Sequence, residues 1–444
     1  MPSKKILIIG EVFVDNHLDM KENGSYIVRL GGIFHAIRAC AALDLEYAFA
    51  YYAPTYLEKD VQKYSKVLNS SKSYRLGLVD KAPNVFLIGG SDESGKQLYN
   101  NVLCNQAEYI HEYDMSRVLE EFNPTDILIF PGRYGTKEIL NNLLEFQGCI
   151  HIDFNYDSED ILHFTNNNIT TAILSTSSTS LSSYFDDNNY DALIDFFGNK
   201  NIKKLLIKEN KGGSCLYDYA SKMWYQSPAY LDRIMHSVGV GDVYNVAYIY
   251  DKFPENIEKT MKFSAWSSVF YAKTMCYETF KEQMHLLMQN ADEQTELMGI
   301  RVPWLFRKKI NIYMAAPDFN YVDTSKLNEL VGALKYHNFN PRLPIRENGQ
   351  ITNDMNIHEE RVIFSKDIEL LEECDFMIAT LLYNDQGTLV EIGTYQAQGK
   401  TVILYDPNKL LNNMFLKYSC NKYCQNLSEV MNAVFEITGR VVNK

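Results

Sequence analysis

The segment CDFMIATLLYNDQGTLVEIGTYQAQGKTVILY, residues 374–405, reads as a strand, a helix and a second strand. The apolar runs at 374–382 and 400–405 have the length of buried strands, and a helix is predicted over residues 387–398 between them. Strands that alternate with helices are typical of a parallel sheet. We therefore expect an open α/β sheet here, with ligands bound at the carboxyl ends of its strands.

This segment is part of a small α/β unit that we expect over residues 309–444. A further strand is predicted at 309–315, and helices are predicted at 323–336 and 357–373. The pattern changes in a Pro- and Trp-containing connector just before this unit. We therefore place a domain boundary near residue 300, with a first domain over residues 1–300.

The first domain alternates short apolar runs with amphipathic stretches, which again indicates a parallel sheet flanked by helices. The predicted strands are 4–10, 47–53, 126–132, 149–155, 171–175 and 203–210. Helices are expected at 31–44, after Gly241, and through 255–290.

Composition excludes several classes of protein. The chain has 444 residues, of which 46% are hydrophobic and 22% charged, so it is a folded globular chain. Its net charge of −13 argues against binding of polymeric nucleic acid and favours small-molecule ligands. No stretch approaches the ~20 apolar residues that cross a bilayer, so we expect a cytoplasmic protein without a membrane partner. The 8 Cys are scattered, which predicts reduced thiols and no metal site.

The loop after the strand at 374–382 carries the sharpest chemical signal. Asp385, Gly387 and Thr388 suit the start of a helix, as a capping carboxylate, a permissive glycine and a hydroxyl. Glu391 follows one turn later, between Val390 and Ile392. On the residues alone, Glu391 is either a first-turn carboxylate favoured by the helix dipole or a catalytic group at the sheet edge.

The string D-x-G-T-x-x-E-I-G at 385–393, with Tyr313-x-Ala315-x-Pro317 before it and Asp367 between them, resembles the nucleoside 2-deoxyribosyltransferase family over residues 309–444. The resemblance implies that Glu391 is the nucleophile that attacks C1′ of a deoxyribose. It also implies that Tyr313 orients Glu391 and that Asp367 protonates the leaving base. The structural alternatives are packing of Tyr313 against a helix and a helix cap at Asp367.

The same resemblance implies the substrate contacts and the assembly. Asp385, with Gly387 and Thr388, would bind the deoxyribose hydroxyls. An Asn from a neighbouring subunit often completes the family's sugar site, and Asn412 is the preferred match. The resemblance therefore implies a homo-oligomer, and no cofactor for this domain.

The segment Gly239-Val240-Gly241-Asp242 precedes a predicted helix in the first domain. Glycines before a helix turn backbone N–H groups toward an anion, and a carboxylate there could accept a proton from a hydroxyl that attacks phosphate. A structural turn with Asp242 as the helix cap is the alternative.

With Gly10-Glu11, Asp15, Gly31-Gly32 and Lys208 to Gly213 before it in the chain, this segment resembles the ribokinase-like (PfkB) carbohydrate kinase family over residues 1–290. The resemblance implies a three-layer α/β fold followed here by a smaller flavodoxin- or Rossmann-like domain, and it implies ATP with Mg²⁺. It places Asp15, Gly31 and Gly32 in the sugar pocket and Gly213 on the nucleotide side. It places Gly239, Val240 and Gly241 in the phosphate anion hole and makes Asp242 the catalytic base.

Three positions depart from the kinase pattern. Ala36 replaces a sugar-binding Asn, Ser175 to Ser178 replace a segment with a carboxylate that organises metal and phosphate, and His236-Ser237 replace a threonine-rich approach to the anion hole.

Together, the two resemblances predict an N-glycosidic transferase or hydrolase for 2′-deoxynucleosides or nucleotides, fused to a sugar or nucleoside kinase domain. The alternative is a degenerate kinase domain that senses a nucleotide or sugar and gates a nucleotide N-glycosidase, with NAD among its substrates.

Overall fold

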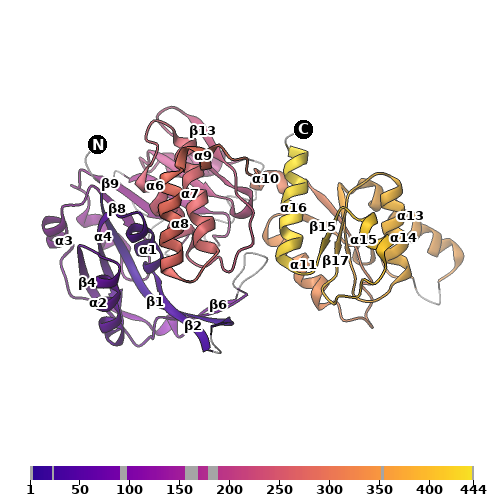
Figure 1. Ribbon diagram of the computed structural model, residues 1–444, viewed down its shortest axis with the longest axis horizontal. Helices are drawn as coiled ribbons and strands as arrows, with labels where there is room; N and C mark the ends of the chain where they lie inside the picture. The colour runs from indigo at the N-terminus through magenta and orange to yellow at the C-terminus, as the bar shows by residue number, and fades with distance from the viewer. Residues whose placement is uncertain are drawn as a thin grey trace. The chain divides into compact units, whose positions relative to one another are not determined.

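The computed structural model describes residues 4–22, 25–90, 98–155, 169–178, 189–351 and 355–442. The chain divides into two compact units, with the N-terminal unit ending at Arg301 and the C-terminal unit running from Val302 to the end of the chain. Each unit has its own sheet (Figure 1).

The sheet of the N-terminal unit contains 13 strands among the described residues. Its main path runs in the order β13-β12-β11-β10-β9-β8-β1-β3-β4-β7, and the pairs from β11 through β4 are parallel. The strands of this path are β1 (Lys5–Glu22), β3 (Glu46–Ala53), β4 (Lys72–Asp80), β7 (Glu108–His111), β8 (Asp126–Ile129), β9 (Cys149–Asp153), β10 (Ile169–Ser175), β11 (Lys204–Lys208), β12 (Ser214–Asp218) and β13 (Met223–Ser227).

Strand β1 is much longer than the predicted strand at 4–10. Its second half pairs with β2 (Ser25–Gly32) and β5 (Val85–Gly89), and β5 pairs with β6 (Leu98–Asn101). Gly31 and Gly32 therefore end a strand, and the prediction that they begin a helix is wrong. The helix begins at Phe34, because Gly32 has φ +58 and lies so close to β1 that a Cβ there would be 2.3 Å from the Glu11 carbonyl oxygen.

Helices cover both faces of this sheet. Their bounds are α1 (Phe34–Ala42), α2 (Glu58–Val67), α3 (Met115–Phe122), α4 (Thr136–Asn142), α5 (Asp191–Gly198), α6 (Val240–Tyr250), α7 (Ile257–Ala272), α8 (Tyr277–Gln289) and α9 (Ala291–Glu296). Helices α1, α6, α7 and α8 form one core with strand residues such as Ile6 and Ile8. The alternate residues Leu7 and Ile9 are equally buried, so the opposite face is covered as well.

The C-terminal unit has a five-stranded sheet in the order β15-β14-β16-β17-β18 among the described residues, with every pair parallel. In chain order this is 2-1-3-4-5, the order of flavodoxin-like folds. The strands are β14 (Asn311–Ala315), β15 (Asn340–Arg342), β16 (Phe376–Thr380), β17 (Val402–Tyr405) and β18 (Lys422–Cys424). The predicted α/β fold class is confirmed for both units.

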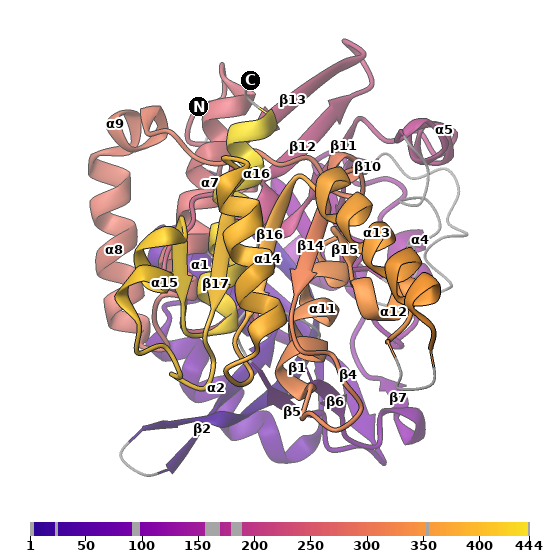
Figure 2. The same cartoon turned by 90° about the vertical axis from the view of Figure 1, so that its right-hand side faces the viewer.

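Helices of the C-terminal unit lie against this sheet (Figure 2). They are α10 (Trp304–Arg307), α11 (Ser325–Tyr336), α12 (Pro344–Asn348), α13 (Ile357–Glu373), α14 (Gln386–Ala397), α15 (Met414–Ser419) and α16 (Leu427–Val442). Helices α13 and α14 bury Leu370, Leu371, Ile392 and Tyr395 against strand residues that include Tyr313. Across the described part of the chain, none of the helices combines the length and apolar character that crossing a bilayer requires.

Candidate functional site

Helix α14 positions Glu391. Asp385 is its N-cap, and Asp385 Oδ2 accepts hydrogen bonds from the Thr388 backbone N–H at 2.7 Å and from the Thr388 hydroxyl at 2.8 Å. Such a cap satisfies N–H groups at the start of the helix and fixes where the helix begins. Glu391 then lies in the second turn of the helix that follows β16, beside the point where the strand order reverses.

Tyr313 lies directly against Glu391. The Tyr313 hydroxyl, on β14, donates a hydrogen bond of 2.7 Å to Glu391 Oε1. The Tyr313 side chain is fully buried, so the sheet fixes its position and the hydroxyl holds the carboxylate in one orientation. Two residues 78 positions apart in the sequence therefore form one catalytic candidate.

The surroundings of Glu391 favour its neutral form. Burial raises the pKa of Glu391 to about 7, the carboxylates of Asp367 and Asp385 act in the same direction, and the hydrogen bond from Tyr313 opposes them. Burial also raises the pKa of Tyr313, so Tyr313 remains a donor. A carboxyl group that titrates near neutral pH at the edge of a parallel sheet is typical of catalytic sites.

Asp367 lies in the middle of α13 and not at the start of a helix, so its interpretation as a helix cap is wrong. The capping box of α13 consists of Asn356 and Glu359, which lie eleven and eight residues before Asp367. Asp367 accepts a hydrogen bond of 2.8 Å from the Asn348 side chain, and burial raises its pKa. Asn348 was not among the predicted site residues; it ends α12, and nothing in its local sequence indicated a partner 19 residues away.

The remaining predicted residues of the C-terminal unit lie on loops and helix starts. Asp385 Oδ1 accepts a hydrogen bond from the Tyr383 hydroxyl at 3.4 Å, and Gly387 lies beside Asp385, where a Cβ would be 3.2 Å from Oδ2. Asn412 is exposed just before α15. Its neighbour Asn413 is the N-cap of α15 and accepts from two backbone N–H groups.

In the N-terminal unit, Asp15 and Gly31 are in contact. A Cβ at Gly31 would lie 2.1 Å from Asp15 Oδ1, so the carboxylate packs directly against the glycine backbone. Asp15 Oδ2 is also 3.0 Å from Nε2 of His35. His35 packs in turn on Gly239, where a Cβ would lie 2.1 Å from its ring. The structure thus brings the predicted sugar residues to the start of α6.

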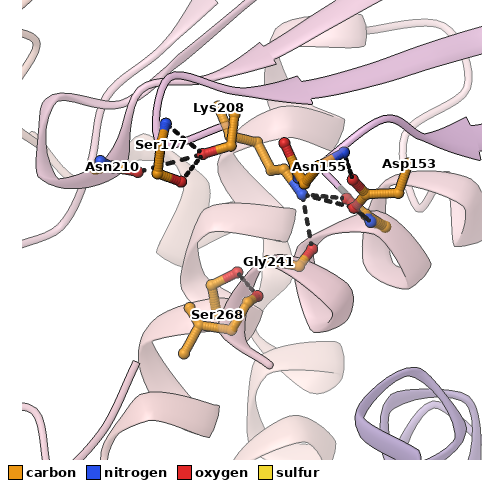
Figure 3. Close-up of polar contacts among 10 residues, drawn as sticks. Asp153, Asn155, Ser177, Lys208, Asn210, Gly241 and Ser268 are labelled. Atoms are coloured by element: carbon orange, nitrogen blue, oxygen red, sulfur yellow. Dashed lines mark hydrogen bonds and ion pairs between the residues drawn. The ribbon is translucent and has the colours of Figure 1, made fainter. Parts of the chain in front are cut away.

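The ammonium group of Lys208 lies at the start of α6, and the sequence did not predict this position for it. Figure 3 shows Lys208, at the end of β11, reaching toward Asp153 and Gly241. Its Nζ is 3.1 Å from Asp153 Oδ2, 2.9 Å from Asn245 Oδ1 and 3.3 Å from the Gly241 carbonyl oxygen. Asn245 also donates to Asp153 at 2.5 Å. Asp242 lies in the first turn of α6 and is 6% exposed.

This arrangement suits phosphate more closely than Mg²⁺. The Asp153 carboxylate, an oxygen ligand of the kind that Mg²⁺ uses, is paired with an ammonium group. The hydroxyls of Ser175 and Ser177 are hydrogen-bonded to each other at 2.7 Å. The backbone of Gly239 to Gly241, at the start of α6, instead favours anionic oxygens.

Gly213 directly precedes β12 and lies beside Arg301. Gly213 has φ +104, and a Cβ there would be 2.3 Å from the Ser227 carbonyl oxygen, so this position requires glycine. Arg301 donates to the Gly212 carbonyl at 2.8 Å and is ion-paired with the fully buried Glu209.

Asp126, Cys149 and His151 are the single described group whose ligand atoms lie close enough together for a metal ion, within 4.8 Å. Asp126 Oδ1 is 3.9 Å from Lys4 Nζ and 3.4 Å from His151 Nε2, and its other oxygen accepts from the Thr125 hydroxyl at 2.7 Å. The Lys4 ammonium group is thus a nearby opposite charge for the Asp126 carboxylate.

Comparison with known proteins finds similarities for both units. A family model described as nucleoside 2-deoxyribosyltransferase matches residues 312–437. The chain is similar to the structure of ribokinase from Giardia lamblia, with a TM-score of 0.51 and 14% identity over 65% of this chain and 100% of that chain. It is also similar to Arabidopsis thaliana ribokinase complexed with ribose and ATP, with a TM-score of 0.49 and 12% identity over 65% of this chain and 99% of that chain.

A search of curated proteins finds no match to this chain. Because the similarity to the Giardia lamblia structure is at low sequence identity, it establishes fold and not activity. The chain therefore carries a nucleoside 2-deoxyribosyltransferase domain over residues 312–437, preceded in the sequence by a unit with the ribokinase fold.

Proposed function

We propose that the C-terminal unit cleaves the N-glycosidic bond of 2′-deoxynucleosides or nucleotides through a covalent glycosyl–Glu391 intermediate. The observation that carries the proposal is the hydrogen bond from buried Tyr313 to Glu391, which holds a carboxylate in one orientation at the ligand-binding edge of the sheet. A carboxylate so held can attack an anomeric carbon as the bond to the base breaks.

The proposed reaction has two balanced steps. In the first, a Glu391 oxygen bonds to C1′, the C1′–N bond breaks, and Asp367 gives its proton to the departing base. Burial raises the pKa of Asp367, which favours the protonated form that this step needs. In the second step, a new base or water attacks C1′, Asp367 takes up the proton, and Glu391 is released as a carboxylate.

Asp385 would bind the sugar hydroxyls, with Gly387 and Thr388 shaping the loop around it. Asp385 Oδ2 already accepts two hydrogen bonds from Thr388, so Oδ1 is the oxygen that would meet the sugar. Asn412 of a second subunit would complete the site, which makes the active form a homo-oligomer.

The experiment is separation of deoxynucleosides, deoxynucleotides and NAD by chromatography after incubation with the protein, with and without a second free base. We expect base exchange or hydrolysis in the wild type and loss of turnover by at least about a thousandfold in Glu391→Gln. Glu369→Gln, an exposed glutamate of α13, is the matched control and should keep full activity. Normal turnover in Glu391→Gln would refute the nucleophile.

A second measurement tests the intermediate itself. A 2′-fluoro-arabinosyl nucleoside slows the second step, because fluorine destabilises the oxocarbenium-like transition state. Mass spectrometry should then find one added fluorosugar on the peptide that contains Glu391, and none in Glu391→Gln. Turnover without any such adduct would favour direct attack by water.

For the N-terminal unit we propose phosphoryl transfer from ATP, with Asp242 as the base that accepts the hydroxyl proton and Gly239 to Gly241 around the phosphates. The alternative, a nucleotide or sugar sensor that gates the glycosidase, is favoured by the pairing of Lys208 with Asp153, which occupies the carboxylate that a metal would use. ATP consumption over a panel of sugars and nucleosides separates the two. If the wild type consumes ATP and Asp242→Asn does not, the result supports the kinase. If the wild type consumes no ATP, the result supports the sensor.

A further inference from the structure

Three side chains of different ligand chemistry lie together at the amino ends of β8 and β9, and we call them the Cys149 cluster. They are Asp126, the first residue of β8, and Cys149 and His151, the first and third residues of β9. Asp153, which pairs with Lys208, ends the same strand β9, so the cluster lies at the opposite end of the strand from that ion pair. Neither proposed activity uses these three residues.

The register of β8 and β9 places the three side chains on one face of the sheet. Asp126 pairs with Cys149, and Leu128 pairs with His151, in a parallel ladder. Because side chains alternate between faces along a strand, Cys149 and His151 share a face, and Asp126 lies beside them on it. The sequence did not reveal this group, because only the pairing of the two strands brings the carboxylate to the thiol and the imidazole.

The spacing of the cluster fits the ligands of one metal ion. Asp126 Oδ1 and His151 Nε2 are 3.4 Å apart, which is long for an N–H···O hydrogen bond. An oxygen and a nitrogen that each lie about 2.1 Å from a tetrahedral zinc ion are separated by about 3.4 Å. The Cys149 sulfur lies within 4.8 Å of the other ligand atoms, and a side-chain rotation that shortens this to about 3.6 Å completes three corners of the tetrahedron.

The imidazole of the cluster is buried with incomplete hydrogen bonding. The His151 side chain is more than nine-tenths buried, and its Nδ1 has no hydrogen-bond partner among the described residues. Its Nε2 has only the long contact with Asp126, which is equally buried. Such groups are costly to bury, so a folded protein normally supplies them with partners. A metal ion bonded to the imidazole would supply the missing interaction.

The neighbours of Asp126 orient its carboxylate and leave one oxygen for a metal. The Thr125 hydroxyl donates to Asp126 Oδ2 at 2.7 Å, and the Lys5 backbone N–H donates to Thr125 Oγ1 at 2.9 Å. Asp126 Oδ1 is 3.9 Å from Lys4 Nζ, which also donates to the Ile249 carbonyl. Lys4 therefore keeps an acceptor when Oδ1 binds a metal. Hydrogen bonds that orient a carboxylate from behind are typical of metal sites.

The ligand types favour zinc. Zn²⁺ binds thiolate, imidazole and carboxylate together, whereas Mg²⁺ and Ca²⁺ take oxygen ligands. The thiolate of Cys149 and the carboxylate of Asp126 balance the two charges of the ion, and His151 binds in its neutral form. Cys149 is the partly exposed member, so the ion can enter from its side and a water molecule can take the fourth position.

We propose that the N-terminal unit binds one Zn²⁺ through Asp126 Oδ1, Cys149 Sγ and an imidazole nitrogen of His151, with water as the fourth ligand. Binding releases the thiol proton of Cys149 to solvent and breaks no covalent bond of the backbone. The ion joins the amino ends of β8 and β9, and it stabilises the folded unit because it binds the folded chain. The proposal is independent of both proposed activities.

The test is titration of the reduced, metal-free full chain with Co²⁺, which takes the tetrahedral geometry of zinc and absorbs visible light. We expect one equivalent to produce the bands of tetrahedral Co²⁺ together with the charge-transfer band of a cobalt–thiolate bond. One equivalent of Zn²⁺ should then remove both. Bands of octahedral Co²⁺, or no charge-transfer band, would overturn the proposal.

The variants assign the metal to the cluster. Cys149→Ser should lose the charge-transfer band, and His151→Gln should bind Zn²⁺ at least about tenfold more weakly in competition with a chromogenic chelator. The matched control is Cys276→Ser, which removes an exposed cysteine of the same unit and should change neither result. Loss of the band in Cys276→Ser, with normal binding in the other two variants, would show an adventitious surface thiol and overturn the proposal.

Two measurements on the wild type decide if a variant fails to fold. Zn²⁺ should slow the alkylation of Cys149 and not that of Cys276, as mapped by mass spectrometry of the labelled peptides. Zn²⁺ at about a hundredfold excess over its dissociation constant should also raise the unfolding midpoint of the wild type by a few degrees in calorimetry. Equal alkylation of Cys149 with and without Zn²⁺, or an unchanged midpoint, would contradict the site.

Discussion

At the scale of single residues, the proposed chemistry of the C-terminal unit depends on the protonation of Glu391. The proposed nucleophile must be ionised, and burial raises its pKa to about 7. Activity should therefore fall as the pH drops through this value, because protonated Glu391 cannot attack C1′. We expect kcat/KM of the wild type to decrease about tenfold for each pH unit below about 6, as measured by initial rates over a range of buffers. A kcat/KM that stayed constant at low pH would contradict the role of Glu391.

Tyr313 gives a sharper test at the same scale. Its hydrogen bond lowers the pKa of Glu391, so Tyr313→Phe should move the acid limb of kcat/KM to higher pH and reduce the rate about tenfold at pH 7. The measurement is the pH profile of the variant beside that of Tyr423→Phe, which removes a hydroxyl at the edge strand β18. A uniform loss of rate with an unmoved limb would show that Tyr313 acts through packing alone.

Sequence reasoning placed Tyr313, Asp385 and Glu391 in one site through a short pattern that a family shares, and the structure brings Tyr313 and Glu391 into contact. It did not find Asn348 or the environment of Lys208. Those contacts join residues from separate elements; the Lys208 side chain, for example, contacts groups on both β9 and α6. Periodicity in the local sequence does not predict contacts of this kind.

At the scale of elements, the cap of α14 should determine the local stability around Glu391. Asp385→Ala removes the acceptor for two groups of Thr388 and should destabilise the helix by about 1 kcal/mol. Hydrogen exchange of peptides covering residues 386–397 should show faster exchange, and Asp385→Asn, which keeps an acceptor oxygen, should largely restore protection. Unchanged exchange in Asp385→Ala would show that packing alone holds the helix.

The elements also show why some predictions failed. The core strands were predicted because each is a compact apolar run, and β9 begins at Cys149 as expected. The extension of β1 to Glu22 was missed, because it depends on pairing with β2 and β5 and not on its own polar sequence. The alternative of a helix cap at Asp367 failed because the cap of α13 is Asn356.

At the scale of the whole molecule, the proposed homo-oligomer has a surface that would suit it. Helix α15, next to Asn412, leaves Met414, Phe415 and Tyr418 between 66% and 84% exposed. Contiguous apolar side chains of this kind mark interaction surfaces. Phe415→Ser should lower the molar mass in light scattering and reduce glycosidic turnover, because Asn412 would no longer reach a neighbouring site.

The control is Leu286→Ser on α8, which removes an exposed apolar side chain from the other unit and should leave the mass unchanged. A full-size assembly in Phe415→Ser would remove α15 from the interface. Loss of mass with full turnover would show that each subunit's site is complete by itself.

The amine of Lys208 at the start of α6 is a counter-ion for the Asp153 carboxylate, and it is tethered to the polypeptide. A chelator can strip a divalent metal from a protein, but it cannot remove a lysine side chain. Binding of a phosphorylated ligand at Gly239 to Gly241 would consequently keep part of its electrostatic support in EDTA, where a purely metal-dependent nucleotide site would lose all of it.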